Sequence, residues 1–410
     1  MEMQPSSSRP SSPLTRRAFL AGTAAAAAFA IVRPAAVRGA EANSKIELGV
    51  VGCGGRGNWI ANLFAQHGGY KVSAVADYFP DVANRCGDAL GVDKARRFSG
   101  LLGYKRMIES KIDAIALETP PWFFPEHATT AVAAGCHVYM AKPVACDVPG
   151  TLAIAQAGKR ATEKKRCFLV DFQTRTDPFF QEVVKRVHEG ALGPIGLIST
   201  CYQDEGFPDP PKTKTVDSRF QSLIWCNDVD LGGGYFVNAG IHAIDVGMWL
   251  ARTKPVSAVG SSRIRRKDPH GDSHDVFSLT FEFPGDIVLN HRGEHINNLS
   301  GFVCTCAAYG QGAFMEGSYE GKTWLRGGPM AVKGGDVRNL YGEGAKRNID
   351  TFHKSVTQGV FDNPTVEPSV NSTLACILGR EAGRSGTKVT WDEMIKANKR
   401  IDVDLMGLTQ

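Results

Sequence analysis

Residues 45–64 read KIELGVVGCGGRGNWIANLF, and this stretch decides the fold of the first half of the chain. Its apolar run 46–51 predicts a buried β-strand, and glycines then follow at 52, 54 and 57 in the G-x-G-x-x-G spacing. The next apolar residues recur at helical spacing, and they are Trp59, Ile60, Leu63 and Phe64. The stretch therefore predicts a strand, a glycine-rich turn and an amphipathic helix in that order.

Each glycine has its own physical role in such a turn. Gly52 permits the tight turn, Gly54 lets a pyrophosphate approach the backbone, and Gly57 lets the helix pack closely on the strand. The start of the helix, at Gly55 and Arg56, would offer free N–H groups and a partial positive charge to the phosphates. We therefore assign these five residues to a dinucleotide-binding site.

A second predicted strand strengthens this interpretation. The run KVSAVAD ends at Asp77, 20 positions after Gly57. An acid at that place accepts hydrogen bonds from the adenosine ribose, and its charge would repel a 2′-phosphate. The predicted cofactor is therefore NAD rather than NADP. A glycine-rich turn beside a surface aspartate is the alternative, but the order of strand, turn, helix, strand and acid favours a cofactor site.

Strands and helices continue to alternate to about residue 172. Further strands are predicted in IDAIALETPP (112–121), GCHVYMAKPVACD (135–147) and CFLVDFQTR (167–175), with a helix through 128–134. This order predicts an α/β fold, with a doubly wound Rossmann domain over residues 45–172. Because cofactors bind at the carboxyl ends of such strands, Thr119, Pro120 and Lys142 are expected at the site.

Residues 173–400 have a different pattern. A helix is predicted in 177–193, and strands are predicted in 194–203, 275–283, 286–293 and 302–318, with a hairpin turn at 310–312. This predicts an α+β domain built on a largely antiparallel sheet, followed by an extended segment, 401–410, without readable chemistry. The apolar face of 277–283 is compatible with a homo-oligomer, a dimer or tetramer, and equally with cover from within the chain.

The residues GGGYFVNAGIHAID, 232–245, carry the most suggestive chemistry of this second half. Their apolar residues continue at helical spacing, so a helix is predicted, with Asn238 as its N-cap. His242 would share a face with Asn238, and Asp245 could orient the histidine ring. The spacing alone also fits a structural histidine.

Two motifs together resemble those of the Gfo/Idh/MocA family, which includes glucose–fructose oxidoreductase and inositol dehydrogenase. They are MAKP at 140–143 and the GGGYFVNAGIHAID stretch, and the resemblance extends to ILGREAG at 377–383 and VTWDEM at 389–394. It implies a cis Lys142-Pro143 bond, a lysine that contacts substrate hydroxyl and cofactor, and a catalytic acid/base at His242. It also implies that Arg175 lies near the site.

The resemblance implies an oxidoreductase that acts on a sugar, polyol or glycoside carbinol. His242 would take the proton, Lys142 would polarise the alcohol and Asn238 would orient the substrate. Tyr202, Arg175 and Asp245 are the predicted substrate contacts, and no metal site is expected.

Two positions depart from the family pattern. Ala141 stands where a glutamate is usual, and Asn238 stands where an acid is usual; an amide cannot take a proton from a hydroxyl. Two alternatives therefore stay open: a glycoside-cleaving enzyme that uses NAD through transient oxidation and elimination, and a non-catalytic sugar-binding homologue.

The first 40 residues have the order of an export signal. Arg16 and Arg17 lie in TRRAFL, which resembles a twin-arginine motif, and an alanine-rich apolar run and small residues follow. We predict export by the twin-arginine machinery to the periplasm or the medium, with no membrane span after signal removal; an alanine-rich helix lying on the fold is the alternative. Free NAD is not expected outside the cytoplasm, so an exported enzyme should hold its cofactor tightly.

Charge and cysteine content exclude two other classes of protein. Residues 1–40 contain five arginines and one glutamate, so they carry +4 of the formal +5, and the remainder gives no reason to expect nucleic-acid binding. Ten cysteines are scattered without the spacing of a zinc ribbon or a disulfide scaffold, and most are expected to be small core residues, with an occasional disulfide left open.

Overall fold

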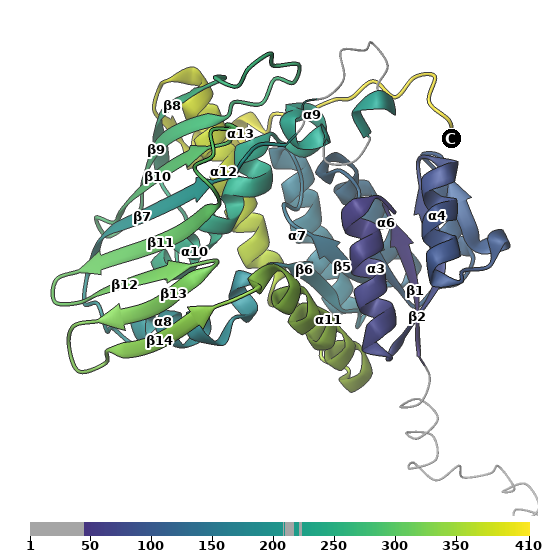
Figure 1. Ribbon diagram of the computed structural model, residues 1–410, viewed down its shortest axis with the longest axis horizontal. Coiled ribbons are helices and arrows are strands. Elements are labelled where there is room, and N and C mark those ends of the chain that lie inside the picture. Colours follow the sequence, from purple (N-terminus) through teal and green to yellow (C-terminus); the bar gives the residue numbers. More distant parts are fainter. Residues whose placement is uncertain (1–44, 208, 210–216, 221–223) are drawn as a thin grey trace, which may run out of the picture. The chain divides into compact units, whose positions relative to one another are not determined.

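The computed structural model describes residues 45–207, 209, 217–220 and 224–410 (Figure 1). The predicted export signal, residues 1–40, lies outside these ranges. Residues 45–410 form one packed unit, in which two sheets are joined by helices. Among the described residues, none of the helices combines the length and hydropathy needed to cross a bilayer.

The first sheet is the predicted Rossmann sheet. Its six strands are all parallel, in the order β3-β2-β1-β4-β5-β6. They are β1 (Ile46–Val51), β2 (Tyr70–Asp77), β3 (Arg97–Ser99), β4 (Ala114–Leu117), β5 (His137–Ala141) and β6 (Phe168–Asp171). The strand order reverses between β1 and β4, and this switch point leaves a crevice at the carboxyl ends of these strands.

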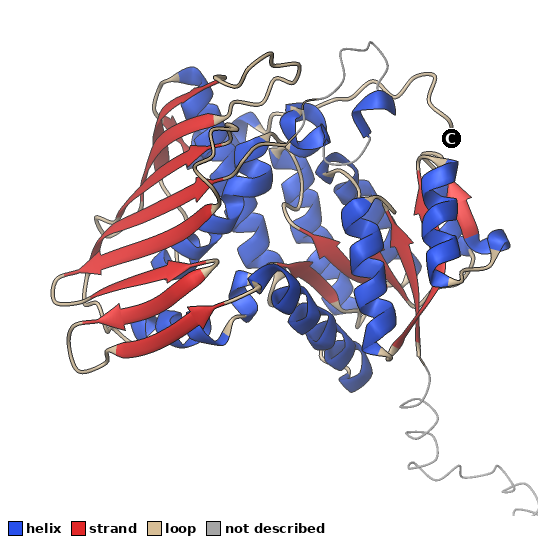
Figure 2. Ribbon diagram, in the orientation of Figure 1, coloured by secondary structure: helices blue, strands red, loops and turns tan. Residues whose placement is uncertain are grey.

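Helices cover both faces of this sheet, as Figure 2 shows. They include α3 (Gly55–His67), α4 (Pro80–Leu90), α5 (Gly103–Glu109), α6 (Phe124–Ala134) and α7 (Val148–Glu163). A later helix, α11 (Leu340–Gln358), returns to pack on α3, where Phe352 meets the ring of Phe64 and Tyr70 Oη donates to the carbonyl of Ile349. The core beneath the Rossmann sheet is therefore completed from the distant end of the chain.

The second sheet has nine strands in the order β14-β13-β12-β11-β7-β10-β9-β8-β15, and only the β7–β10 pair is parallel. The predicted antiparallel sheet and its hairpin turn between β11 and β12 are confirmed. The strands are β7 (Ile195–Gln203), β8 (Ser257–Arg263), β9 (Val276–Glu282), β10 (Val288–Glu294), β11 (Val303–Gly310), β12 (Phe314–Ser318), β13 (Gly321–Arg326), β14 (Val332–Val337) and β15 (Val389–Thr390).

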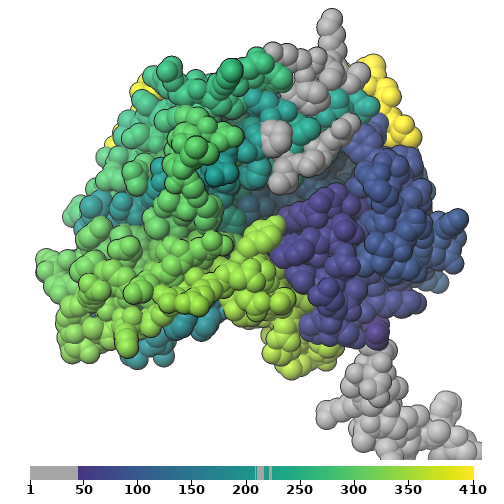
Figure 3. Space-filling view, viewed as in Figure 1, coloured from purple at the N-terminus to yellow at the C-terminus, as the bar shows by residue number. Residues whose placement is uncertain are grey.

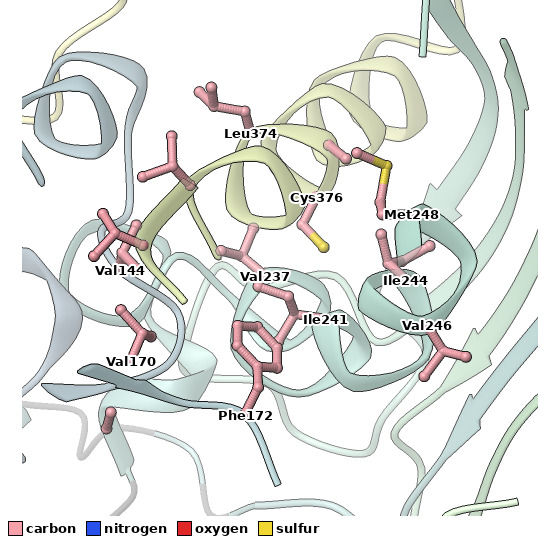
Figure 4. Packing of buried hydrophobic residues seen from close by; sticks show 14 of the residues in the cluster. Val144, Val170, Phe172, Val237, Ile241, Ile244, Val246, Met248, Leu374 and Cys376 are labelled. Atoms are coloured by element: carbon pink, nitrogen blue, oxygen red, sulfur yellow. The ribbon is translucent and has the colours of Figure 1, made fainter. Parts of the chain in front are cut away.

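The apolar face of β9 is covered within the chain. Two helices pack on this side of the sheet, α10 (Ile241–Ala251) and α12 (Val366–Ser385). The α12 backbone comes so close that a Cβ at Gly379 would lie 2.6 Å from Phe281. Figure 4 shows the side chains of α10 and α12, among them Ile241, Ile244 and Cys376, meeting in the core. All ten cysteines lie in described ranges, and each is a buried free thiol, as expected for small core residues.

Candidate active site

A cavity of about 670 Å³ lies at the carboxyl ends of β1, β2 and β4, at the switch point of the Rossmann sheet. Several residues that the sequence assigned to the cofactor line it, namely Gly52, Gly54, Gly55, Asp77, Thr119 and Pro120. Trp225 also lines the cavity, whereas Arg56 does not.

The glycine loop is crowded on one side and open on the other. Gly52 has a φ of +86°, and a Cβ there would lie 2.7 Å from the main chain of Glu118. A Cβ at Gly57 would lie only 1.6 Å from the carbonyl oxygen of Gly52. At Gly54 and Gly55, by contrast, a Cβ would meet no atom within 4 Å. The loop therefore packs tightly on the sheet and leaves a cradle in which the residues present fit a dinucleotide pyrophosphate.

Asp77 is fixed at the edge of this cavity. Its Oδ2 accepts a 2.7 Å hydrogen bond from the backbone N–H of Cys53, and its Oδ1 accepts a 3.0 Å bond from that of Phe79. Burial raises the pKa of Asp77, and these two backbone bonds oppose the rise. The carboxylate thus ends β2 where the ribose of a bound dinucleotide would lie.

Lys142 follows β5 and is joined to the second half of the chain. The Lys142-Pro143 bond is cis, which agrees with the family resemblance. Lys142 Nζ donates a 2.6 Å hydrogen bond to the backbone oxygen of Asn238. Burial, and then the positive charge of Arg56, lower the pKa of Lys142 to about 8.

The predicted N-cap role of Asn238 is wrong. Asn238 lies inside a π-helical turn, Phe236–Gly240, which runs directly into α10, and Gly240 caps α10 without a side-chain bond. The backbone is therefore already helical at Phe236, before Asn238, so Asn238 is not the residue at which the helix begins. The side chain of Asn238 is 7% exposed, and its Oδ1 accepts a 3.4 Å bond from the thiol of Cys226. Wide turns of this kind are frequent at functional sites.

His242 is the second residue of α10 and is 8% exposed. Its ring lies parallel to that of Tyr202 at 6.2 Å and edge-on to that of Tyr319 at 5.3 Å. No described residue hydrogen-bonds its Nδ1. Burial, then the charges of Lys142 and Arg56, hold the pKa of His242 well below its usual value. The ring is therefore neutral near pH 7 and able to accept a proton.

Asp245 does not orient His242, contrary to prediction. Its carboxylate accepts two 2.9 Å bonds from Arg175, and Ser372 on α12 donates a further 2.7 Å bond. The helix thus turns Asp245 toward α12 and away from the histidine. Arg175 also lies over Trp249 at 5.1 Å and lines a different cavity, and its role as a substrate contact stays a prediction. Tyr202 is the one predicted substrate contact that lies beside His242.

Arg56 turns away from the cavity into a buried network that the sequence did not predict. Its guanidinium donates to Glu118 at 2.9 Å, to Asp171 at 2.6 Å and to Tyr341 at 2.6 Å. Both carboxyl side chains are fully buried. Burial raises the pKa of Glu118 to about 7, although Arg56 lowers it.

A sequence signal for this network does exist. Glu118 directly follows β4, Asp171 ends β6, and Lys142 follows β5 between them. Acids at the carboxyl ends of two buried strands are expected to meet at one edge of a parallel sheet. Arg56, from the first turn of α3, is the cation that joins them.

Comparison with known families agrees with this geometry. Residues 46–172 match the model for an oxidoreductase family with an NAD-binding Rossmann fold, and residues 180–298 match the GFO/IDH/MocA C-terminal domain. The two matches together cover well over half of the chain. The chain belongs to the Gfo/Idh/MocA family. Its first domain is therefore the NAD-binding Rossmann domain of this oxidoreductase family.

Individual Gfo/Idh/MocA relatives are distant. The chain is 24% identical to an inositol 2-dehydrogenase of Rhizobium meliloti (strain 1021) over 235 residues, which cover 57% of this chain and 64% of that enzyme. An aldose-aldose oxidoreductase from Caulobacter crescentus complexed with glycerol superimposes with a TM-score of 0.67 and 21% identity, over 85% of this chain and 100% of that one.

A second solved structure, scyllo-inositol dehydrogenase from Lactobacillus casei with bound cofactor NAD(H) and scyllo-inositol, gives a TM-score of 0.66 at 18% identity. It covers 85% of this chain and 100% of its own. These likenesses show a shared fold over 85% of the chain.

Gly54→Ala tests the cradle. The backbone at Gly54 has a φ of −66°, which alanine adopts, and its Cβ would meet no protein atom. We expect an unchanged melting temperature but NAD binding weakened at least about tenfold, because the methyl group would occupy the side where phosphate approaches. Titration with NADH fluorescence measures this, with Gly312→Ala, also in open space, as the control. Unchanged affinity in Gly54→Ala would contradict the assignment.

Proposed function

We propose that this protein is an NAD-dependent oxidoreductase that acts on a carbinol of a sugar, polyol or glycoside and holds its cofactor tightly. The observation that supports this most is the 2.6 Å hydrogen bond from Lys142 to the backbone of Asn238. It brings an ammonium group to the helical stretch that carries His242. Neither Lys142 nor His242 lines the dinucleotide cavity, but Glu118, whose charge acts on Lys142, does. Lys142 and Asn238 are 96 positions apart in the chain, so only the tertiary fold brings them together.

The proposed chemistry divides the work among three side chains. His242, which burial keeps neutral near pH 7, accepts the proton of the substrate hydroxyl. Lys142 stabilises the negative charge that develops on the substrate oxygen. Asn238 orients a neighbouring hydroxyl, and the ring of Tyr202 contacts the substrate. The bound dinucleotide supplies hydride transfer, and Gly52, Gly54, Gly55, Thr119 and Pro120 would hold it.

We propose NAD rather than NADP as the cofactor. Both Asp77 oxygens already accept backbone bonds, so the carboxylate is fixed where a 2′-phosphate would meet its charge.

Twin-arginine export, proposed from residues 1–40 alone, would require NAD to leave the cytoplasm with the protein. Assay of periplasmic and cytoplasmic fractions tests the export.

Glycoside cleavage through transient oxidation is the second candidate, and one observation favours it. Elimination needs a base for a C–H proton beside the oxidised carbon. A pKa of about 8 gives Lys142 a neutral fraction that an ordinary lysine lacks near pH 7.

The third candidate, a non-catalytic sugar-binding homologue, is supported only by Asn238 and Ala141. Incubation with assorted glycosides separates the three: ketosugar or NADH, released aglycone, or binding without turnover.

We also propose a homo-oligomer. Leu197 and Tyr309 lie opposite one another on β7 and β11 and are 37% and 43% exposed on the outer face of the nine-stranded sheet, and Val259 on β8 is 38% exposed. The apolar face of 277–283 is buried within the chain, so it does not contribute to the proposed oligomer interface. Light scattering of the purified protein measures the oligomeric state.

His242→Ala tests the catalytic assignment. We expect turnover to fall about 100-fold or more, because the proton acceptor is lost, while NADH binding stays unchanged. Steady-state kinetics and NADH titration measure the two effects. The control is His188→Gln, whose parent side chain bonds the carbonyl of Trp249 on another part of the molecule. Turnover of His242→Ala equal to that of the parent would refute the role.

The pH profile tests Lys142. The folded-state pKa of Lys142 is lowered to about 8, so its charge is present below pH 8 and lost above it. We expect kcat/KM for oxidation to fall as pH rises through about 8, whereas the neutral His242 should give no limb near pH 6.5. In Lys142→Arg, whose cation persists, residual activity should lack the alkaline fall. An alkaline limb retained in that variant would assign it to another group.

A further inference from the structure

The segment 401–410 follows α13 (Trp391–Ala397) and runs along the carboxyl edge of the Rossmann sheet. Figure 1 shows it in yellow, ending beside α4. Its first residues alternate in exposure: Ile401, Val403 and Leu405 are half-buried, whereas Asp402 and Asp404 are exposed. An extended segment with one apolar side facing the protein gives this pattern.

One end of the segment is anchored beside β4 and β5. The backbone N–H of Ile401 donates a 2.8 Å bond to Oδ2 of Asp147, a buried residue that also caps α7. The indole N–H of Trp122 donates a 2.9 Å bond to the carbonyl oxygen of Ile401. Trp122 follows β4, and Asp147 follows β5.

The other end is anchored beside β2 and β3. The backbone N–H of Leu101 donates a 2.9 Å bond to the carbonyl oxygen of Thr409, and the N–H of Thr409 lies 3.4 Å from the hydroxyl oxygen of Tyr78. Gly100, with a φ of +80°, approaches so closely that a Cβ would lie 2.4 Å from the backbone oxygen of Gln410. Tyr78, Gly100 and Leu101 all line the dinucleotide cavity.

The anchors of segment 401–410 lie on both sides of the glycine loop. In the sheet, β1 lies between β2 and β4, and the glycine loop follows β1. The segment is therefore tied to the strands on both sides of the loop that would cradle the phosphates. Phe220 spans the same gap, with its ring 5.2 Å from Tyr78 and 5.5 Å from Phe123. Figure 3 shows the yellow segment lying against the blue surface of the Rossmann domain.

We propose that segment 401–410 is part of the cofactor site and retains the adenosine half of the dinucleotide, so that the dinucleotide leaves slowly. It braces Tyr78, Gly100 and Leu101, which form the cavity wall beside Asp77. Opening that wall requires the hydrogen bonds of the segment's backbone groups to break, which adds to the free-energy barrier for release of the dinucleotide. The proposal rests on the proposed function only in taking NAD(H) as the ligand.

The test is the rate at which bound NADH is released. Protein of the full chain and a variant lacking residues 402–410 are loaded with NADH and mixed with excess NAD⁺. Energy transfer from tryptophan to the nicotinamide reports release, since Trp225 lines the cavity. We expect release to be at least about tenfold faster in the shortened variant. Trp122→Phe, which loses the N–H donor to Ile401, should show a smaller acceleration, whereas Trp249→Phe serves as a matched control with no acceleration.

The outcomes separate the two proposals. NADH binding by the full chain, with equal release rates in the shortened variant, would overturn the role of the segment and leave the proposed function intact. Absence of NADH binding to the full chain would overturn both. Where circular dichroism shows the shortened variant to be unfolded, Trp122→Phe decides: release as slow as in the parent refutes the inference.

Discussion

The hydrogen bond between Lys142 and the backbone of Asn238 places an ammonium group where a second cation, Arg56, already lies. Two positive charges in a poorly solvated place are costly unless acids balance them. Glu118 and Asp171 supply that balance from the strands on either side of Lys142. The site is therefore held by a four-charge cluster, in which the carboxylates fix Arg56 and leave Lys142 free to bond across to the second half of the chain.

This cluster supplies acids close to Lys142 in a site that departs from the family pattern at two positions. Ala141 and Asn238 remove two acids that relatives usually place beside the lysine and the histidine. The carboxylate of Glu118 is contributed by the neighbouring strand, one position beyond β4, so the edge of the sheet keeps a negative charge close to Lys142. Burial raises the pKa of Glu118 to about 7 and lowers that of Lys142 to about 8, and the charge of each group partly opposes the effect of burial on the other.

The sequence correctly predicted the structural features that are determined by residues close together in the chain. The glycine loop, the alternating strands and the period-two apolar face of β9 are each set within a few residues, and the fold agrees with them. The pairings of Asp245 and Arg56 depend instead on residues far away in the chain, Ser372 and Asp171 among them. The N-cap prediction for Asn238 failed because this residue lies inside a wide helical turn, which side-chain preferences do not signal. On segment 401–410 itself, the anchoring groups are backbone groups of Ile401 and Thr409, which carry no sequence signature. The side chains that bind them, such as those of Trp122 and Asp147, lie far away in the chain.

The proposed retention of the cofactor by segment 401–410 would constrain the chemistry that can follow. With slow release, turnover would be fastest if a second substrate, or a later step of the same cycle, regenerated the cofactor in place. In the proposed roles, His242, which burial keeps neutral near pH 7, would take a proton from a hydroxyl, and Lys142, with a pKa of about 8, would return one. These two roles together would suit a redox-neutral cycle on a sugar.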